Sequence, residues 1–299
     1  MQVKLLQTQG QGHFEEVIWT KPEIAHNEIE VKSIYTGICR SDIDMMMGTF
    51  PALPQHMMGH EGLGCVTKVG SSVQKIYEGD IVATRGEPAY AEYYNSKIGE
   101  FIRVPKIEPK YIIEPVACGV NLVYQNIRQI FKLGGQSRRL LILGSGFLAQ
   151  VAYQTIKKYY ELNFEIDVVG NHNKEVWGDL LKSKPQGTYD VIIDLSSGTD
   201  VFDSVLYNEN ALIIIGSDKT VTTSFANMLW KSVTINFPSP RNPSFYKSME
   251  IAVELVKLDL FDPTNYWTKG YDRNDWQSAF EDGKNRPASY NRGYLKFNT

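Results

Sequence analysis

The sequence predicts an α/β protein of two domains, and three observations support this fold class. The chain has 299 residues, 42% of them hydrophobic, which is enough for about two domains with full cores. Its first third is rich in β-branched residues and is divided by glycine and proline into short runs, which predicts mostly antiparallel strands. From about Glu114, strand patterns alternate with helix patterns, and this rhythm predicts βαβ units in a parallel, doubly wound sheet.

The individual elements follow from these patterns in chain order. In the first third, runs at residues 28–31 and 64–69 predict strands. Later strands are expected at residues 140–143, 165–169, 191–194 and 211–215, and helices at residues 117–132, 147–160, 175–181 and 248–258. After Pro263 the pattern loses its parallel-sheet rhythm. We therefore expect residues 1–116 and 264–299 to form one domain and residues 117–263 to form the other.

The composition argues against several classes of protein. The 31 basic and 34 acidic side chains give a net charge of −3, which provides no positive surface for nucleic acid or for an anionic membrane. No apolar run approaches the roughly 18–20 residues of a membrane span, and the first residues lack the apolar core of a signal peptide. Three cysteines make no disulfide framework, which favours a reducing compartment. We expect a cytoplasmic protein with no nucleic-acid or membrane partner.

A glycine-rich turn follows one of the expected strands. Gly144, Gly146 and Ala149, with Phe147 and Leu148 between them, match the G-x-G-x-x-G/A fingerprint after a strand and at the start of a helix. Gly144 permits the tight turn, Gly146 lets the backbone approach a pyrophosphate, and Ala149 lets helix and strand pack closely. The start of the helix then offers N–H donors to the phosphates. The pattern predicts a dinucleotide site, and a glycine turn without a ligand is the alternative.

The choice of cofactor depends on the end of the next strand. An NAD site usually has an acidic residue there, about 20 residues after the glycines, to bind the ribose hydroxyls. Residues 170–174 hold no acid, and Asn171, His172 and Lys174 could donate hydrogen bonds to a 2′-phosphate. We therefore expect NADP(H) in preference to NAD(H). The alternative is that Asn171 serves an NAD ribose and the other two residues belong to an ordinary polar loop.

Three separate segments carry side chains suited to a metal ion. They contain Cys39, His60 and Glu114, and each is ordinary when taken alone. Together with Gly-Asp-Ile-Val at residues 79–82 and Ala-Glu-Tyr at residues 91–93, they resemble the zinc-dependent medium-chain dehydrogenase/reductase family, the alcohol and polyol dehydrogenases. The resemblance covers nearly the whole chain.

The resemblance implies a catalytic domain of GroES-like β-barrel type, interrupted in the sequence by a Rossmann domain. It also implies one catalytic zinc ion, held by Cys39, His60 and Glu114, with Glu61 as a supporting group or an exchangeable ligand. One thiolate, one imidazole and one carboxylate leave a fourth position open for a substrate oxygen, so that zinc can act as a Lewis acid.

Further roles are implied around the first of these ligands. Ser41 matches the hydroxyl residue that begins the family's proton relay, and Asp44 stands where many members have the histidine that passes the proton on. Asp42 would orient one of the ligands. Arg40 would reach the cofactor pyrophosphate, and an ordinary surface arginine is the alternative.

The chain also departs from the family pattern. Many zinc members carry a lobe with four cysteines and a second zinc, but no cysteine here lies between Cys65 and Cys118, so one zinc ion per chain is expected. Members commonly assemble through an edge strand of the Rossmann sheet. Residues 232–237 are expected to form that edge in a homodimer or homotetramer, with an interior strand as the alternative. The candidates for the substrate cleft are Phe50, Pro51 and Leu53.

These observations predict a zinc-dependent oxidoreductase that transfers a hydride between NADP(H) or NAD(H) and an alcohol or polyol, or the aldehyde or ketone in reverse. A zinc-free quinone or enoyl reductase of the same superfamily is a second hypothesis, and it requires Cys39, His60 and Glu114 to be incidental. A third hypothesis is a non-catalytic dinucleotide-binding protein that keeps the fold.

Overall fold

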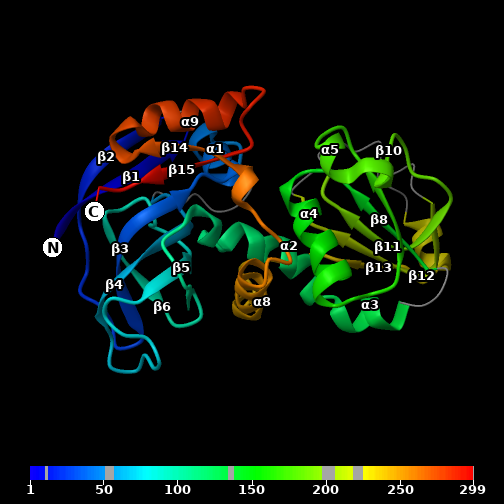
Figure 1. Cartoon of the computed structure of the whole chain (residues 1–299), viewed down its shortest axis with the longest axis horizontal. Coiled ribbons are helices and arrows are strands. Elements are labelled where there is room, and N and C mark those ends of the chain that lie inside the picture. The colour runs from blue at the N-terminus through cyan, green and yellow to red at the C-terminus, as the bar shows by residue number, and fades with distance from the viewer. Residues whose placement is uncertain (11–12, 51–56, 134–137, 197–205, 218–224, 299) are drawn as a thin grey trace. The chain divides into compact units, whose positions relative to one another are not determined.

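The structure, a computed structural model, describes residues 1–298 except 11–12, 51–56, 134–137, 197–205 and 218–224. The chain forms two compact units, the first made of Met1–Val116 with Ala252–Thr299 and the second of Ala117–Ile251 (Figure 1). Helix α8 (Phe245–Lys257) lies across the second division. A boundary drawn from the sequence at residue 263, beyond the end of this helix, therefore differs from the structural one.

The first unit is built on a largely antiparallel sheet. The strands of the first unit, inside and outside this sheet, are β1 (Gln2–Gly10), β2 (His13–Thr20), β3 (Glu28–Gly37), β4 (Glu61–Val69), β5 (Ile81–Arg85), β6 (Tyr93–Lys97), β7 (Phe101–Arg103), β14 (Trp267–Asp272) and β15 (Arg292–Lys296). The sheet has the order β14-β15-β3-β4-β5-β7, with β6 also paired to β3, while β1 and β2 form a separate antiparallel pair. Only β14 and β15 pair in parallel among the described strands of this unit. The mostly antiparallel character predicted for this part of the chain is confirmed.

Strand β3 lies at the centre of this unit. It pairs with β15, β4 and β6 and is buried at most of its positions. Its apolar side chains Ile29 and Val31 join a hydrophobic cluster with Val66, and a second cluster begins just beyond its end, around Ile38 and Met58. Because β3 is paired on both edges and packed on both faces, the position of its last residues is strongly fixed.

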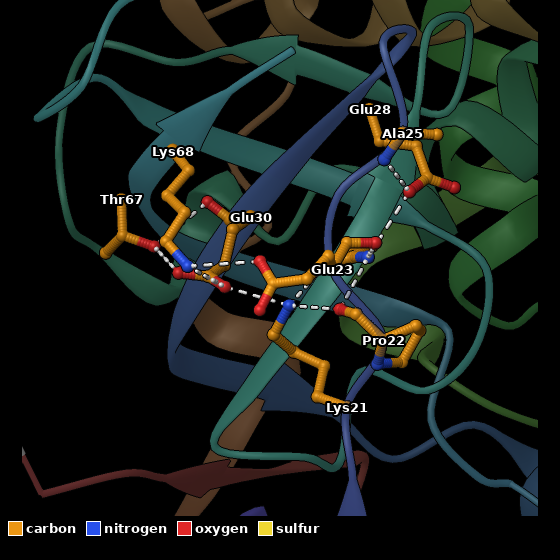
Figure 2. Close-up of polar contacts among 9 residues, drawn as sticks. Lys21, Pro22, Glu23, Ala25, Glu28, Glu30, Thr67 and Lys68 are labelled. Atoms are coloured by element: carbon orange, nitrogen blue, oxygen red, sulfur yellow. Dashed lines mark hydrogen bonds and ion pairs between the residues drawn. The ribbon is translucent and has the colours of Figure 1, made fainter. Parts of the chain in front are cut away.

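A buried ion pair joins the end of β2 to β3 (Figure 2). The Lys21 ammonium lies 2.8 Å from Glu30 Oε2, and it donates to Asn95 Oδ1 at 2.7 Å and to Pro22 O at 2.8 Å. These three acceptors use all three N–H donors of the lysine. Glu30 also accepts a hydrogen bond from Thr67 Oγ1 at 2.9 Å. Both charges therefore have hydrogen-bond partners inside the protein. Through them Lys21, the residue just after β2, is connected to β3, β4 and β6.

Helix α1 (Arg40–Met47) follows β3 directly, and helix α9 (Trp276–Asn285) packs against it. Cys39 is the N-cap residue of α1, and its backbone N–H donates to Asp42 Oδ2 at 3.1 Å. A Cβ at Gly283 of α9 would lie 3.2 Å from Ile43 Cδ1, so this glycine allows a close approach of the two helices. Cys39 is thus fixed at the start of a packed helix.

The second unit contains a six-stranded parallel sheet. Its strands are β8 (Arg139–Leu143), β9 (Glu165–Val169), β10 (Leu181–Lys182), β11 (Thr188–Asp194), β12 (Leu206–Ile215) and β13 (Thr234–Asn236). The sheet order β10-β9-β8-β11-β12-β13 is the 3-2-1-4-5-6 order of a dinucleotide-binding sheet. In such sheets the ligand binds beyond the carboxyl ends of the strands where the order reverses, which here is between β8 and β11. The predicted parallel sheet is confirmed.

The described helices of the second unit are α2 (Glu114–Tyr124), which begins in the first unit, α3 (Ile127–Leu133), α4 (Phe147–Gln154), α5 (Lys174–Trp177) and α7 (Ala226–Trp230), together with the first part of α8. The prediction of one helix over residues 117–132 is wrong in its middle. Asn126 separates α2 from α3, because its side-chain amide donates to Leu122 O at 2.8 Å and its own carbonyl accepts the first hydrogen bonds of α3. Side-chain bonds of this kind compete with the helical pattern.

Two other predicted helices differ from the structure in length. Helix α4 ends at Gln154 and the chain continues as a π-helix over Thr155–Tyr159, so the expected helical stretch to residue 160 changes its type. In place of the helix expected over residues 175–181, the structure has the short α5, then a 3₁₀ turn over Gly178–Leu180, and then β10. In the described part of the chain, no helix has the length and hydropathy needed to cross a bilayer.

Candidate active site

Three side chains with metal-binding atoms meet in the first unit where β3 ends and β4 begins. One ligand atom from each of Cys39, His60 and Glu61 lies within 4.8 Å of the others. The antiparallel register pairs Thr36 with Gly62, so the chain just after β3 lies beside the chain just before β4. A thiol, an imidazole and a carboxyl group form a donor set that suits zinc. No second group of this kind occurs among the described residues.

The His60 ring is held from one side by Asp42. Asp42 Oδ1 lies 3.2 Å from His60 Nδ1, and Ser41 Oγ lies 3.4 Å from His60 Nε2. An acid at Nδ1 would leave Nε2 for a metal ion, and metal-binding histidines usually have such an acid at their other ring nitrogen. Burial alone would lower the pKa of His60, but the charge and hydrogen bond of Asp42, followed by Cys39, raise it well above its usual value. The negative groups around His60 therefore stabilise its protonated ring, and a metal ion at Nε2 would take the place of that proton.

Tyr90 contacts Asp42 through its hydroxyl, and the sequence alone did not indicate it as a site residue. Its hydroxyl is 2.8 Å from Asp42 Oδ2 and 3.0 Å from Gly37 O, and the side chain is completely buried. Burial, followed by the charge of Asp42, raises the pKa of Tyr90 well above its usual value. The tyrosine is therefore a permanent hydrogen-bond donor to the site.

Glu61 is fully buried and is ion-paired with Arg292 of β15. Arg292 Nη2 donates to Glu61 Oε2 at 2.6 Å and also to Oε1. A Cβ at residue 37 would lie 2.0 Å from Glu61 Oε2, so Gly37 leaves the space that this carboxylate fills. Burial alone would lower the pKa of Arg292, but the negative charges of Glu61, Cys39 and Glu114 raise it above its usual range. Arg292, which the sequence reasoning also missed, is thus a permanent cation beside the candidate ligands.

Glu114 occupies a different place from the other two predicted ligands. It is buried at the first residue of α2 and is close enough to Arg292 for its charge to act there, but it is not one of the three grouped side chains. Glu114 as the third zinc ligand stays a prediction.

Asp44 and Arg40 pair with each other on α1. Arg40 Nε lies 2.9 Å from Asp44 Oδ1, and the arginine side chain is half exposed. Their predicted roles in the proton relay and at the cofactor pyrophosphate stay predictions. Of the residues suggested for the substrate cleft, Phe50 packs against the hydrophobic cluster that contains Met45, whereas Pro51 and Leu53 lie outside the described residues.

The glycine turn of the second unit has the geometry that a dinucleotide site needs. Gly144 has a φ of 108°, and its N–H donates to Val169 O at 2.7 Å. Gly146 is the exposed N-cap residue of α4, and a Cβ built there meets no atom within 4 Å, so the space before the helix is open. Ala149 is buried, as are Phe147 and most of the first turn, while Leu148 is half-buried. Backbone N–H groups at this helix start can meet phosphate oxygens.

The loop after β9 presents three polar side chains to solvent. Asn171, His172 and Lys174 are exposed, and their side chains have no hydrogen-bond or ion-pair partner among the described residues. The His172 backbone N–H donates to Ser145 Oγ at 2.9 Å, which ties this loop to the glycine turn. The carboxylate of Asp167, within β9 itself, accepts hydrogen bonds from Arg139 and from the Tyr189 hydroxyl.

Comparison with known proteins finds similarity to alcohol and polyol dehydrogenases. Residues 25–106 match the model of the alcohol dehydrogenase GroES-like domain. A D-arabitol-phosphate dehydrogenase of Enterococcus avium is 22% identical over 87% of this chain and 88% of its own length. The chain thus contains an alcohol dehydrogenase GroES-like domain and has the fold of the medium-chain dehydrogenases/reductases. A mannitol dehydrogenase 1 of Stylosanthes humilis, named as probable, is 38% identical, but the match spans only 24% of this chain and 20% of that relative.

Solved structures of the medium-chain dehydrogenase/reductase fold agree with both units of the chain. An alcohol dehydrogenase of E. coli CFT073, solved with NADH, superimposes with a TM-score of 0.80 at 17% identity, and the match covers 99% of each chain. The predicted fold class, a GroES-like domain combined with a Rossmann-type parallel sheet, is confirmed. In this chain, residues 86–92 join β5 to β6, so the segment that could hold a cysteine-rich lobe is a short connection.

Proposed function

We propose that this protein is a zinc-dependent oxidoreductase. It transfers a hydride between a nicotinamide cofactor and an alcohol or polyol, or the aldehyde or ketone in the reverse direction. The observation that carries the proposal is the group formed by Cys39, His60 and Glu61. Asp42 supports this group by lying beside Nδ1 of the histidine. The names of the relatives, mannitol and D-arabitol-phosphate dehydrogenases, support a polyol as the substrate class.

The residues present fit a zinc ion. Cys39 and His60 would bind it, and Glu114 or Glu61 would provide the carboxylate, with Glu61 shared between the metal and Arg292. Zinc bound there would supply Lewis-acid catalysis of the hydride transfer. The buried Asp42 carboxylate lies against the His60 ring, and the three donor types are those of catalytic zinc sites.

Ser41 and Asp44 would move the proton. Ser41 Oγ, already beside His60 Nε2, is placed to hydrogen-bond the oxygen of the substrate hydroxyl and to take its proton. Asp44 lies one helical turn further along α1, where it pairs with Arg40. The proton would leave through this pair to solvent.

The cofactor proposal is NADP(H) in preference to NAD(H). It is supported by the exposed donors of Asn171, His172 and Lys174 after β9, and by the absence of an acid at residues 170–174. A 2′-phosphate needs such donors, whereas the hydroxyls of an NAD ribose are usually bound by a carboxylate.

A second copy of the chain is the proposed partner. Strand β13 is at the edge of the parallel sheet in the described part of the chain, and large apolar side chains near it are exposed: Phe225, Leu229, Trp230 and Phe237. An unpaired edge flanked by exposed aromatic residues favours association with an identical edge.

The deciding experiment combines metal analysis with a substrate panel. Purified protein is expected to hold zinc, and to oxidise alcohols or polyols with a change in nicotinamide absorbance that a chelator abolishes. Cys39→Ser and His60→Ala should lose this turnover and keep cofactor binding. Unchanged turnover in both variants would eliminate the zinc mechanism and favour a zinc-free reductase. Cofactor binding with no turnover of any substrate would favour a non-catalytic protein.

A further inference from the structure

Tyr90 supports the segment that presents His60. Its ring packs edge-on against Phe280, with ring centroids 5.5 Å apart, and its backbone N–H donates to Met58 O at 3.1 Å. A Cβ at Gly59 would lie 2.6 Å from Tyr90 Cγ, so the glycine just before His60 allows the ring to lie directly against the backbone. The tyrosine therefore lies against the backbone next to a candidate ligand, while its hydroxyl donates to Asp42.

The hydroxyl of Tyr90 also completes the contacts of a buried carboxylate. Asp42 is fully buried, and its Oδ2 faces two donors, the Cys39 backbone N–H at 3.1 Å and the Tyr90 hydroxyl at 2.8 Å. Its Oδ1 faces His60 Nδ1 at 3.2 Å. Losing a donor to a buried carboxylate is costly, because no water replaces it without rearrangement. Of the two groups that fix Oδ2, only Tyr90 is a side chain and can be changed.

We propose that Tyr90 is a positioning residue for the metal site. Its hydroxyl fixes the Asp42 carboxylate, and Asp42 in turn holds the His60 ring with Nδ1 toward the acid and Nε2 toward the ion. This inference rests on the proposed zinc function. Groups that orient metal-binding histidines typically change metal affinity by about 10–100-fold when they are removed.

Tyr90→Phe removes the hydroxyl alone, and the chain offers a matched control. Tyr94 is equally buried in the same unit, and its hydroxyl lies 2.6 Å from Thr84 Oγ1, so Tyr94→Phe removes a buried hydroxyl that does not face Asp42. Zinc dissociation constants are measured by competition with a chromophoric chelator. We expect the constant to rise about tenfold to hundredfold in Tyr90→Phe and to stay within about twofold in Tyr94→Phe.

Two further measurements separate a positioning role from a merely structural one. With Co²⁺ in place of zinc, the visible absorption bands should change in Tyr90→Phe and keep their wild-type form in Tyr94→Phe. In a double-mutant cycle, Tyr90→Phe should add little to the loss of zinc affinity caused by Asp42→Asn, because both changes act through the same carboxylate.

The outcomes distinguish this inference from the proposed function. Wild-type protein that binds no zinc overturns both. Wild-type binding with an unchanged constant in Tyr90→Phe, or with equal losses in the two tyrosine variants, overturns the inference alone. If Tyr90→Phe does not fold, Asp42→Asn carries the test, and unchanged zinc affinity in that variant overturns the proposal.

Discussion

Arg292 and Glu61 form a buried ion pair between residues 231 positions apart in the sequence, with Arg292 Nη2 at 2.6 Å from Glu61 Oε2. The guanidinium also lies over the Trp267 ring, 4.9 Å from its centroid. Such a pair is costly to break, because one partner is then left charged and buried. The pair therefore couples the carboxyl-terminal strand to the candidate ligands.

Breaking this pair should destabilise the first unit. Arg292→Met leaves the Glu61 carboxylate buried without its cation, and we expect a loss of about 3–5 kcal/mol in the free energy of unfolding of the metal-free protein. Urea unfolding followed by tryptophan fluorescence measures it. The double variant Glu61→Gln with Arg292→Met should recover part of the loss. A single variant within about 1 kcal/mol of wild type would contradict the buried pair.

The chain should hold one zinc ion. Its three cysteines are far apart in sequence, and residues 86–92 leave no lobe between β5 and β6 for a second site. Metal analysis by mass spectrometry should return one tightly bound equivalent per chain in wild type and much less in His60→Ala. Two tightly bound equivalents would show that a second site exists.

The loop after β9 should control the cofactor preference. His172→Ala combined with Lys174→Ala removes two donors for the 2′-phosphate, and we expect kcat/KM with NADPH to fall about tenfold to hundredfold while the value with NADH changes little. Lys184→Ala is the control, because it removes an exposed positive charge elsewhere in the same unit. A wild-type enzyme that strongly prefers NADH would disprove the proposal.

The ion pair between Lys21 and Glu30 should make stability depend on pH. Burial alone would raise the pKa of Glu30, but hydrogen bonds from Lys21 and Thr67 and the charge of Lys21 lower it below its usual value of 4.5. A lowered pKa in the folded state gives stability that is fully present above pH 4.5 and is lost as the pH falls through the folded value.

Glu30→Gln isolates this contribution. The difference in unfolding free energy between wild type and the variant should be largest at pH 7, at about 3–5 kcal/mol, and should shrink as the pH falls below 4.5. Urea unfolding at a series of pH values measures it. A difference that stays constant between neutral and acidic pH would show that the pair does not titrate in this way.

The exposed edge of the second unit should form the contact between subunits. Trp230, which is 84% exposed, precedes β13 in the sequence, and the exposed Phe237 follows it directly. Light scattering is expected to show a dimer or tetramer in wild type and a smaller species for Trp230→Lys with Phe237→Lys. Leu258→Lys, an exposed apolar position outside this edge, serves as the control. A monomeric wild type would reject the interface.

The sequence predicted those parts of the site that depend on local pattern. Cys39 and His60 stand in recognisable segments, and Asp42 is three residues from the cysteine whose backbone it binds. Tyr90 and Arg292 could not be predicted in this way, because they reach Asp42 and Glu61 only through the fold. Both belong to strand-rich segments where a tyrosine or an arginine is ordinary until its buried partner is known.

Some elements of the fold are likewise determined by neighbouring residues, and others by contacts with distant parts of the chain. The glycine turn at Gly144 and the strand before it follow from their own residues, and the structure has them as expected. The break between α2 and α3 depends on Asn126, whose side chain also accepts a hydrogen bond from Asn236 of the distant strand β13 at 2.6 Å. A helical pattern alone gives no sign of that partner.

The place of β15 between β14 and β3 has a consequence for how the protein is made. On the ribosome, β3 and its partners β4 and β6 emerge early. The third partner, β15, and the guanidinium that neutralises Glu61 emerge only after the whole of Ala117–Ile251. The second unit is continuous in sequence and can fold while synthesis goes on, since domains generally fold as units. The second unit, although it begins later in the sequence, is then expected to fold first, and the group of Cys39, His60 and Glu61 gains its guanidinium last.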